Sequence, residues 1–130
     1  MRRRGKLHIF DRLDGAKSAL VVIDMQNFFM KPGMAAEVPT AREIVPNINR
    51  LAGAFQKAGG TVVWIQMTHP PEDKESWSVF YNYVHTPESG AQSLKELVEG
   101  SEGHRFWPEL DVKDGDLTIR KNRFSAFLPG

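Results

Sequence analysis

Two apolar runs that each end on an ionisable residue constrain this chain more than any other feature. The first run, residues 18–24, is rich in valine and isoleucine and ends on Asp24. The last run, residues 116–121, ends on Lys121. The first has the continuous apolar pattern of a strand covered on both faces of a parallel sheet. Ligands of open parallel sheets collect beyond the carboxyl ends of the strands, so we expect Asp24 and Lys121 to face one pocket.

The segments between these runs predict a helix and a second strand. Thr40 and Glu43 have the spacing of a capping box, which predicts a helix beginning at Thr40 as its N-cap. Apolar residues recur at helical spacing after this box, and Gly59-Gly60 predicts the end of the helix. Residues 61–67 then form a second buried strand. The order strand, helix, strand favours an α/β fold with a parallel sheet.

The remaining segments are less regular. Residues 1–17 are basic and polar and are expected to form an arm, and residues 25–39 a loop beyond the first strand. Residues 68–90 make a long segment rich in aromatic side chains. Residues 92–99 are expected to form a short helix, and residues 101–115 an irregular connection. No repeat or linker divides the chain, so one domain is expected.

Composition excludes several classes of function. The formal net charge is +1, and Arg2-Arg3-Arg4 is expected to be a solvated tail, so nucleic acid is not an expected partner. No apolar run approaches the roughly 20 residues that span a bilayer, so no membrane contact is expected. The N-terminus lacks the apolar segment of a secretory signal, so cytoplasmic residence is expected. The chain has no Cys, which excludes disulfides and thiol chemistry supplied by this chain itself.

Six stretches along nearly the whole chain form one ordered series. They are Leu7–Asp14, Ala19–Phe29, Ile44–Leu51, Ala58–Trp64, Gly103–Leu110 (Gly103-His104 and Trp107–Leu110) and Lys121–Phe127. Together they resemble the isochorismatase-like cysteine hydrolases, and in particular the amidohydrolase branch that includes ureidoacrylate and biuret hydrolases. Any one stretch could arise by chance, whereas the ordered series is far more specific.

The resemblance implies a fold and a catalytic triad. The fold is a three-layer α/β/α sandwich around a parallel sheet, and residues 1–130 would be the N-terminal portion of one such domain, incomplete at the C-terminus. The triad is Asp, Lys and Cys, in which Asp24 and Lys121 match the first two. The Cys belongs to a stretch that would follow Gly130, together with the backbone N–H groups of the oxyanion hole. Asp24 would accept the thiol proton, and Lys121 would hold the thiolate.

The function implied by this resemblance is hydrolysis of a C–N bond in a small amide, ureide or carbamoyl compound, with the nucleophile outside this chain. The alternatives are an isochorismatase-type ether hydrolase and a catalytically inactive module for small-molecule binding or assembly. Three explanations for the missing Cys stay open: a longer polypeptide, a second chain from a split gene, and a truncated module. The chain alone is expected to be inactive. A homo-oligomer or a companion C-terminal segment is expected to complete the sheet.

Three further residues are expected to bind the substrate, namely Phe29, Asn27 and Trp77. Phe29 follows the first strand, and loops at strand ends face the ligand. Each candidate also has a purely structural interpretation. Asp24 could cap the turn that follows it, Lys121 could be an exposed strand end, and Phe29 could pack in the core.

Neither a cofactor nor a metal is expected. Related nicotinamidases bind a metal through an Asp-x-His pair after the second strand, and the corresponding residues here are Met67-Thr68-His69. One imidazole beside a thioether is a poor site for a divalent ion. The other histidines, His8, His85 and His104, are scattered along the chain.

Overall fold

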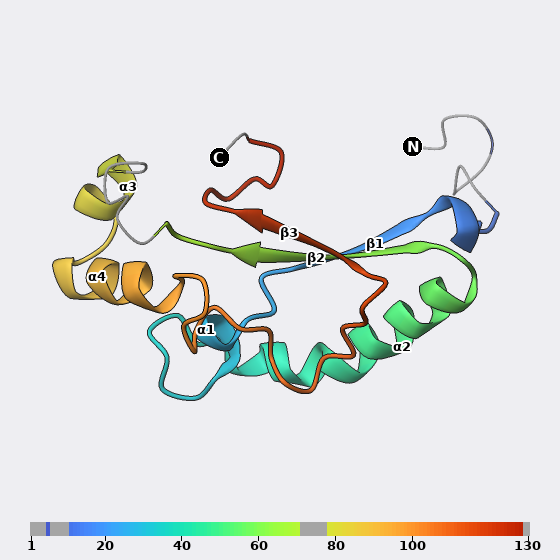
Figure 1. Cartoon of the computed structure of the whole chain (residues 1–130), viewed down its shortest axis with the longest axis horizontal. Helices are drawn as coiled ribbons and strands as arrows, with labels where there is room; N and C mark the ends of the chain where they lie inside the picture. The colour runs from blue at the N-terminus through green and yellow to red at the C-terminus, as the bar shows by residue number, and fades with distance from the viewer. Residues whose placement is uncertain (1–4, 6–10, 71–77, 129–130) are drawn as a thin grey trace.

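The computed structural model describes residue 5, residues 11–70 and residues 78–128. Its elements are η1 (Gly15–Lys17), β1 (Ala19–Ile23), α1 (Asn27–Met30), η2 (Pro39–Ile44), α2 (Val45–Lys57), β2 (Thr61–Met67), α3 (Ser78–Tyr83), α4 (Pro87–Glu96) and β3 (Leu117–Lys121), where η marks a 3-10 helix. The three strands form one parallel sheet in the order β1-β2-β3 (Figure 1). The strands therefore agree with the predicted runs to within one residue at each end.

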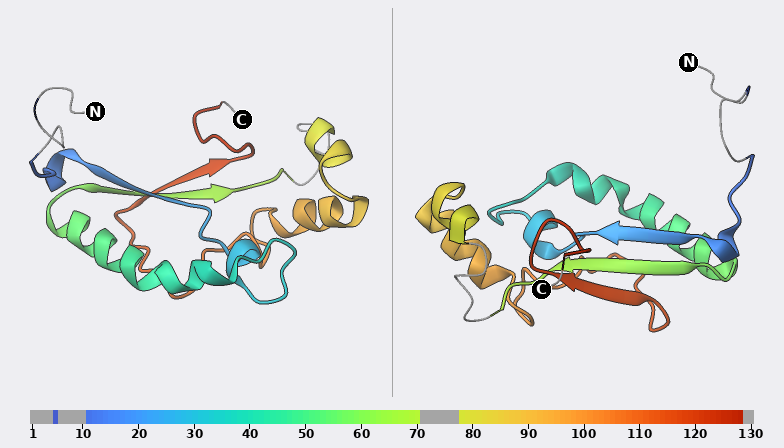
Figure 2. Two further views of the ribbon diagram at one scale, coloured as in Figure 1. Left: turned by 180° about the vertical axis from the view of Figure 1, so that it is seen from behind. Right: turned by 90° about the horizontal axis from the view of Figure 1, so that it is seen from above.

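Helices cover one face of this sheet. α1, α2 and the connection between α4 and β3 all lie on the same side of the strands (Figure 1). Seen from above, the opposite face of the strands has no helix over it among the described residues (Figure 2). The predicted α/β fold with a parallel sheet is confirmed, and the second helical layer of the sandwich is not part of the described chain. No helix in that part combines the length and apolar character that crossing a bilayer demands.

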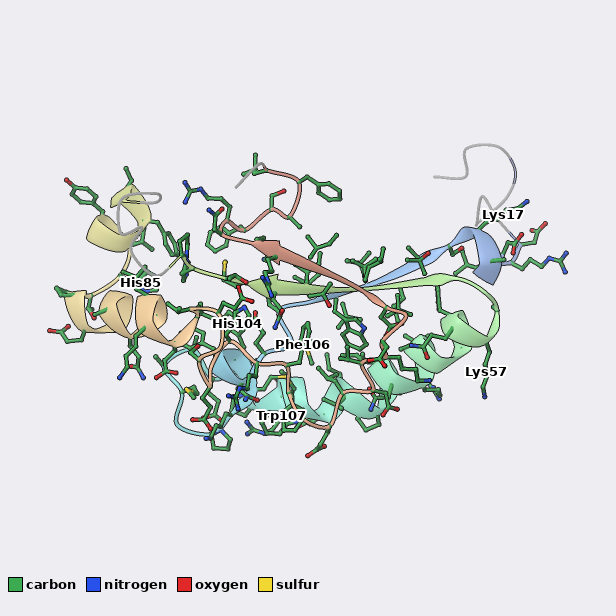
Figure 3. The ribbon with its side chains drawn as sticks, in the orientation of Figure 1. Lys17, Lys57, His85, His104, Phe106 and Trp107 are labelled. Carbon is green, nitrogen blue, oxygen red and sulfur yellow. The ribbon has the colours of Figure 1, made fainter. Side chains whose placement is uncertain are left out.

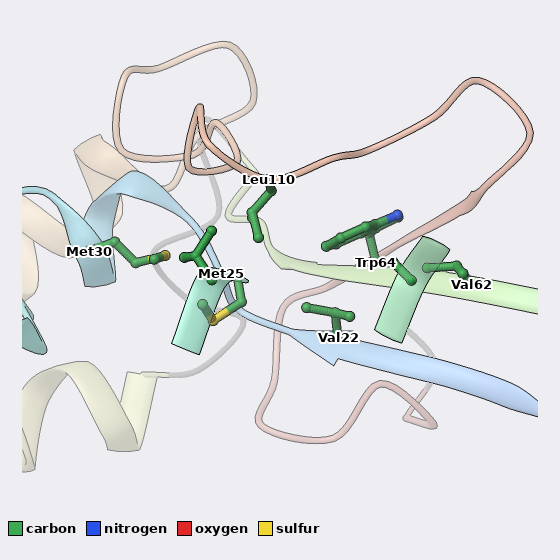
Figure 4. Close-up of a cluster of buried hydrophobic side chains, with 8 residues drawn as sticks. Val22, Met25, Met30, Val62, Trp64 and Leu110 are labelled. Atoms are coloured by element: carbon green, nitrogen blue, oxygen red, sulfur yellow. The ribbon is translucent and has the colours of Figure 1, made fainter. Parts of the chain in front are cut away.

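The main core lies between the sheet and α2. Its buried members are Val22, Met25, Met30, Val45, Ala52, Val62, Trp64 and Leu110 (Figure 4). Trp64 is completely buried, and its indole N–H donates to the Asp116 carboxylate at 2.9 Å. This bond satisfies the one polar atom of a large side chain, which is why a tryptophan can occupy the centre of this core.

The other face of the sheet is apolar and open. In a parallel sheet, paired residues point to the same face, and Val21, Val63 and Leu117 are paired in register, as are Ile23, Ile65 and Ile119. The two residues on β2 are buried by their neighbours, whereas the four on β1 and β3 are 40–54% exposed. Leu117 and Ile119 of β3 therefore share one face, as the strand period of two requires, and both side chains are about half exposed there.

The beginning of the long helix differs from the prediction. Thr40 and Glu43 lie in η2, both are exposed, and the structure records no capping hydrogen bond by Thr40. The α-helix begins only at Val45, with Pro46 in its first turn. Proline has no N–H to donate to a carbonyl four residues earlier, so it is tolerated in the first turn and cannot lie deeper. The helix ends after Lys57 at Gly59, whose φ of +73° is the left-handed conformation expected of a helix-ending glycine.

The middle segment is more helical than the sequence predicted. Residues 78–83 form α3, and the helix expected over residues 92–99 is α4, which begins at Pro87 and ends at Glu96. Thr86 is its N-cap, because the Thr86 hydroxyl oxygen accepts from the Ser89 N–H. A threonine followed by a proline is a recognised start signal, and the sequence interpretation missed it.

Candidate functional site

Asp24 lies directly after β1, at the carboxyl edge of the sheet. Its N–H donates to the Ile65 carbonyl at 3.0 Å, which extends the ladder by one bond. Its φ is +58°, so the backbone is in the left-handed region, which Asp enters at lower cost than most residues. This bend ends the strand and directs the chain into α1. It also holds the carboxylate at the strand end.

Lys121 is the last residue of β3, and the structure brings its ammonium to Asp24. The Lys121 Nζ donates to Asp24 Oδ2 at 2.8 Å and to the Phe124 carbonyl at 3.1 Å. The two residues are 97 positions apart in the sequence and lie on opposite sides of β2. The ion pair therefore crosses the end of the central strand. Only 4% of the Lys121 side chain and 26% of the Asp24 side chain are exposed.

The two carboxylate oxygens of Asp24 differ in their hydrogen bonding. Asp24 Oδ1 is buried and has no hydrogen-bond partner among the described residues. A buried acceptor of this kind is costly unless a further group satisfies it. The other oxygen, Oδ2, is bonded to the Lys121 ammonium at 2.8 Å. The arrangement can therefore accept a proton from a third group that approaches Asp24 Oδ1.

A cavity of about 220 Å³ opens beside this carboxylate. It is lined by Asp24, Phe28, Phe29, Ala36, Met67, His69, Phe80, His85, Ser93, Leu97 and Phe124. Phe28 and Phe29 meet edge to face with their ring centroids 5.1 Å apart. Phe80 and Phe124 make a similar contact at 5.3 Å. Aromatic walls around one ionised group are typical of a small-molecule site.

The sequence-predicted binding residues divide into three cases. Phe29 lines the cavity beside Asp24. Asn27 is buried and is not among the lining residues. Its Nδ2 donates instead to the Glu102 carbonyl at 3.0 Å, which links α1 to the connection between α4 and β3. Trp77 lies outside the described residues. The catalytic and binding roles assigned to these residues stay predictions.

Two histidines of the cavity were missed as a pair by the sequence interpretation. His69 follows β2, and His85 lies between α3 and α4 (Figure 3), yet both line the same cavity. Burial, helped by the positive charge of Arg123, lowers the pKa of His69 from 6.5 to about 4. His69 is therefore a neutral imidazole near pH 7. No sequence spacing links residues 69 and 85, so only the fold reveals their proximity.

The cavity residues do not form a good set of ligands for a divalent metal. The described residues include no group of three His, Cys, Asp or Glu side chains that could hold an ion. The residue two positions before His69 is Met67, whose thioether is a weak ligand for zinc. The charged groups that the described residues bring near the cavity include the Asp24 carboxylate, the Lys121 ammonium and the Arg123 guanidinium, whose charge acts on His69.

Comparison with known proteins identifies relatives over most of the chain. Residues 18–129 match the family model described as the isochorismatase domain. A probable inactive nicotinamidase of Arabidopsis thaliana is 30% identical over 112 residues, which are 85% of this chain and 55% of that protein. The crystal structure of pyrazinamidase of Pyrococcus horikoshii in complex with zinc is 30% identical, with a TM-score of 0.58, over 79% of this chain and 50% of its own.

A cysteine hydrolase from Pseudomonas syringae pv. phaseolicola has the same fold. Its crystal structure matches 88% of this chain and 51% of its own, with a TM-score of 0.75 and 20% identity. An identity this low bears on the fold alone and agrees with the predicted parallel α/β architecture. The chain spans about half the length of the relatives it matches.

Proposed function

Because this chain belongs to the isochorismatase family, we propose that it carries the acid–base half of a cysteine-type hydrolase site. The observation that supports this most is the ion pair between Asp24 and Lys121, with one uncommitted Asp24 oxygen beside an aromatic cavity. Residues 1–130 would form the first portion of one hydrolase domain. The reaction would be hydrolysis of a C–N bond in a small amide, ureide or carbamoyl compound.

The proposed roles follow from ordinary acid–base chemistry. Asp24 Oδ1 would take the proton of a thiol, and Lys121 would stabilise the resulting thiolate and hold the Asp24 carboxylate in place. The thiolate would attack the carbonyl carbon, the C–N bond would break with the proton delivered to the leaving nitrogen, and water would hydrolyse the thioester. This chain has no Cys, so the thiol must come from outside its 130 residues.

The size and lining of the cavity support a small substrate. A cavity of about 220 Å³ is below the usual range for drug-sized ligands and suits a compound of few atoms. Flat groups can stack on Phe29 or Phe124, while the reacting carbonyl faces Asp24. Two of the relatives, a nicotinamidase and a pyrazinamidase, are named for small amides, which favours the amide branch over ether hydrolysis.

A second candidate function is a catalytically inactive binding or assembly module. The absence of Cys from the chain supports it, as does the name of the Arabidopsis relative, which is called inactive. Under either function we propose that a companion segment or a further copy of the chain covers the open apolar face of the sheet.

Two measurements on the mass-verified chain test these proposals. First, ammonia release from nicotinamide and from an N-carbamoyl amino acid is compared between the wild type and Lys121→Ala. We expect no release above background in either, because no thioester can form. Release by the wild type that exceeds Lys121→Ala and resists iodoacetamide would overturn the proposed mechanism.

Second, NMR titration of the same chain with nicotinamide reports on binding. We expect saturable shifts at Phe29 and Asp24, with nicotinic acid as the matched ligand that lacks the amide nitrogen. An absence of shifts from both compounds would remove the small-amide assignment. Equal saturation by both would favour the inactive binding module, because amide recognition would then play no part.

A further inference from the structure

Gln26 has a buried, fully hydrogen-bonded side chain near the ion pair. It has no part in the catalytic roles proposed for Asp24 and Lys121. It is 0% exposed and lies two residues after Asp24. Its Nε2 donates to the Met67 carbonyl at 3.0 Å and to the His104 carbonyl at 2.8 Å. Its Oε1 accepts from the Met67 N–H at 2.8 Å. Both amide hydrogens and the carbonyl oxygen are therefore engaged.

These bonds imitate a missing piece of the β1–β2 ladder. The backbone pairing ends where Ile23 faces Ile65 and Asp24 donates to the Ile65 carbonyl. Beyond that point β1 turns away at the left-handed Asp24, which would leave the N–H and C=O of Met67 without strand partners. The Gln26 carboxamide offers Met67 one donor and one acceptor, as a peptide group of a continuing strand would. Without these bonds, the two buried backbone groups of Met67 would be unsatisfied and would destabilise the fold.

Met67 matters because it is the link to Lys121. Met67 is the register partner of Lys121, and the next residue, Thr68, donates its N–H to the Lys121 carbonyl at 2.8 Å. Asp24 and Gln26 are thus bound to β2 at Ile65 and Met67, and Lys121 is bound to Thr68, the residue after β2. The ion pair between Asp24 and Lys121 then joins β1 to β3 across the end of β2. A shift of the Met67–Thr68 backbone would move Lys121 relative to Asp24.

We propose that Gln26 is a positioning residue, which sets the geometry of the Asp24–Lys121 pair by bracing the end of β2 through its side-chain amide. This inference rests on the proposed function only in giving the pair a catalytic use. If Gln26 had only a structural role, its removal would lower stability but would leave the ion pair between Asp24 and Lys121 intact.

The test is the rate at which the Lys121 ammonium protons exchange with water, measured by ¹H–¹⁵N NMR on the full chain. An ammonium held by a buried carboxylate exchanges slowly. In Gln26→Met, which keeps the side-chain length and removes the amide, we expect exchange roughly tenfold faster, as the loss of one charge-assisted hydrogen bond implies. The readout does not involve turnover, so its failure and the failure of the proposed hydrolysis are distinguishable.

Gln66→Met is the matched control. Gln66 is also buried, and its Nε2 donates to the same His104 carbonyl at 3.0 Å, but the structure shows no bond from its side chain to Met67 among the described residues. We expect the Lys121 exchange rate in this variant to stay near that of the wild type. A folded Gln26→Met with wild-type exchange, or an equal acceleration in both variants, would overturn the proposal.

Two further measurements apply if Gln26→Met fails to fold. Gln26→Asn keeps a carboxamide that is one methylene too short to reach both Met67 and His104. Faster exchange of the Lys121 ammonium in this variant would support the proposal, and exchange at the wild-type rate would overturn it. In the wild type, the Met67 amide should exchange with solvent as slowly as ladder amides of β2. Exchange as fast as that of an exposed loop amide would show that no brace exists, and would overturn the proposal directly.

Discussion

At the scale of single residues, the ion pair between Asp24 and Lys121 couples stability to the candidate chemistry. Removing Lys121 leaves a largely buried carboxylate without its partner. We expect Lys121→Met to lower the free energy of unfolding by about 2–3 kcal/mol, less than for a fully buried pair because Asp24 keeps some contact with water. Urea denaturation followed by circular dichroism measures the change.

Lys31→Met is the control for this prediction. Lys31 forms an ion pair with Glu102, and both side chains are about half exposed. Exposed pairs contribute roughly 0–1 kcal/mol, so we expect little change. Equal losses in the two variants would mean that the Asp24–Lys121 pair is no more buried in solution than a surface pair.

His69 provides a prediction on pH. Burial and the charge of Arg123 lower its pKa to about 4 in the folded chain, against 6.5 without these effects. Between these values the unfolded chain binds more protons than the folded chain, so the free energy of unfolding falls as the pH falls from 6.5 towards 4. The total loss that His69 causes over this range is about 3 kcal/mol at most. Above pH 6.5 its contribution is constant.

The direct check is an NMR titration of the His69 ring. Its resonances should stay constant from pH 8 to about pH 5. In His69→Asn the slope of stability between pH 5 and 6.5 should decrease without vanishing, because burial also lowers the pKa of His104. A ring that titrates near pH 6.5 would show that His69 is hydrated in solution.

At the scale of elements, the two helix starts show how local signals compete. Thr40 and Glu43 carry a capping pattern, yet Pro46 moves the α-helix start to Val45 and leaves residues 39–44 as a 3-10 helix. Thr86 carries the weaker pattern and forms the cap that the structure uses. The proline decides the first case because a helix beginning at Thr40 would place Pro46 beyond its first turn, where the missing N–H interrupts the helical hydrogen bonds.

The two threonines make a matched pair of variants. Thr86→Ala removes the hydroxyl that accepts from Ser89, and we expect a loss of about 1 kcal/mol in the free energy of unfolding. Thr40→Ala removes an exposed hydroxyl that caps nothing, and we expect a change within about 0.5 kcal/mol. Thermal melts of both variants decide between the caps. The reverse order of effects would place the working cap at Thr40.

At the scale of the whole molecule, the open face of the sheet is the dominant feature. Val21, Ile23, Leu117 and Ile119 are 40–54% exposed on that one face, beside the buried Val63 and Ile65 of β2. Contiguous apolar surface of this kind marks an interface or causes aggregation. The outer edges of β1 and β3, the strands that carry these four residues, are also unpaired within the described sheet.

We therefore expect the purified chain to self-associate or to bind an apolar dye. Replacing Ile23 and Leu117 by Thr should weaken self-association by roughly tenfold or more, since each side chain has about half its surface left to bury. Ile44→Thr is the control, because Ile44 is equally exposed but lies in η2, away from the sheet face. Sedimentation velocity over a range of concentrations gives the result. A wild type that stays monomeric and binds no dye would contradict the interface.

Apolar periodicity and glycine act through neighbouring residues, so the sequence predicted the strands, the α/β class and the end of the long helix. It also located Asp24 and Lys121 at one edge, because strands of a parallel sheet end together. Which distant groups complete the site depends on how the loops pack against the strands. The bracing of Met67 by Gln26, the shared cavity of His69 and His85, and the turning of Asn27 towards Glu102 all join segments far apart in the chain. Such contacts depend on where loops pack, and a local pattern carries no information on that.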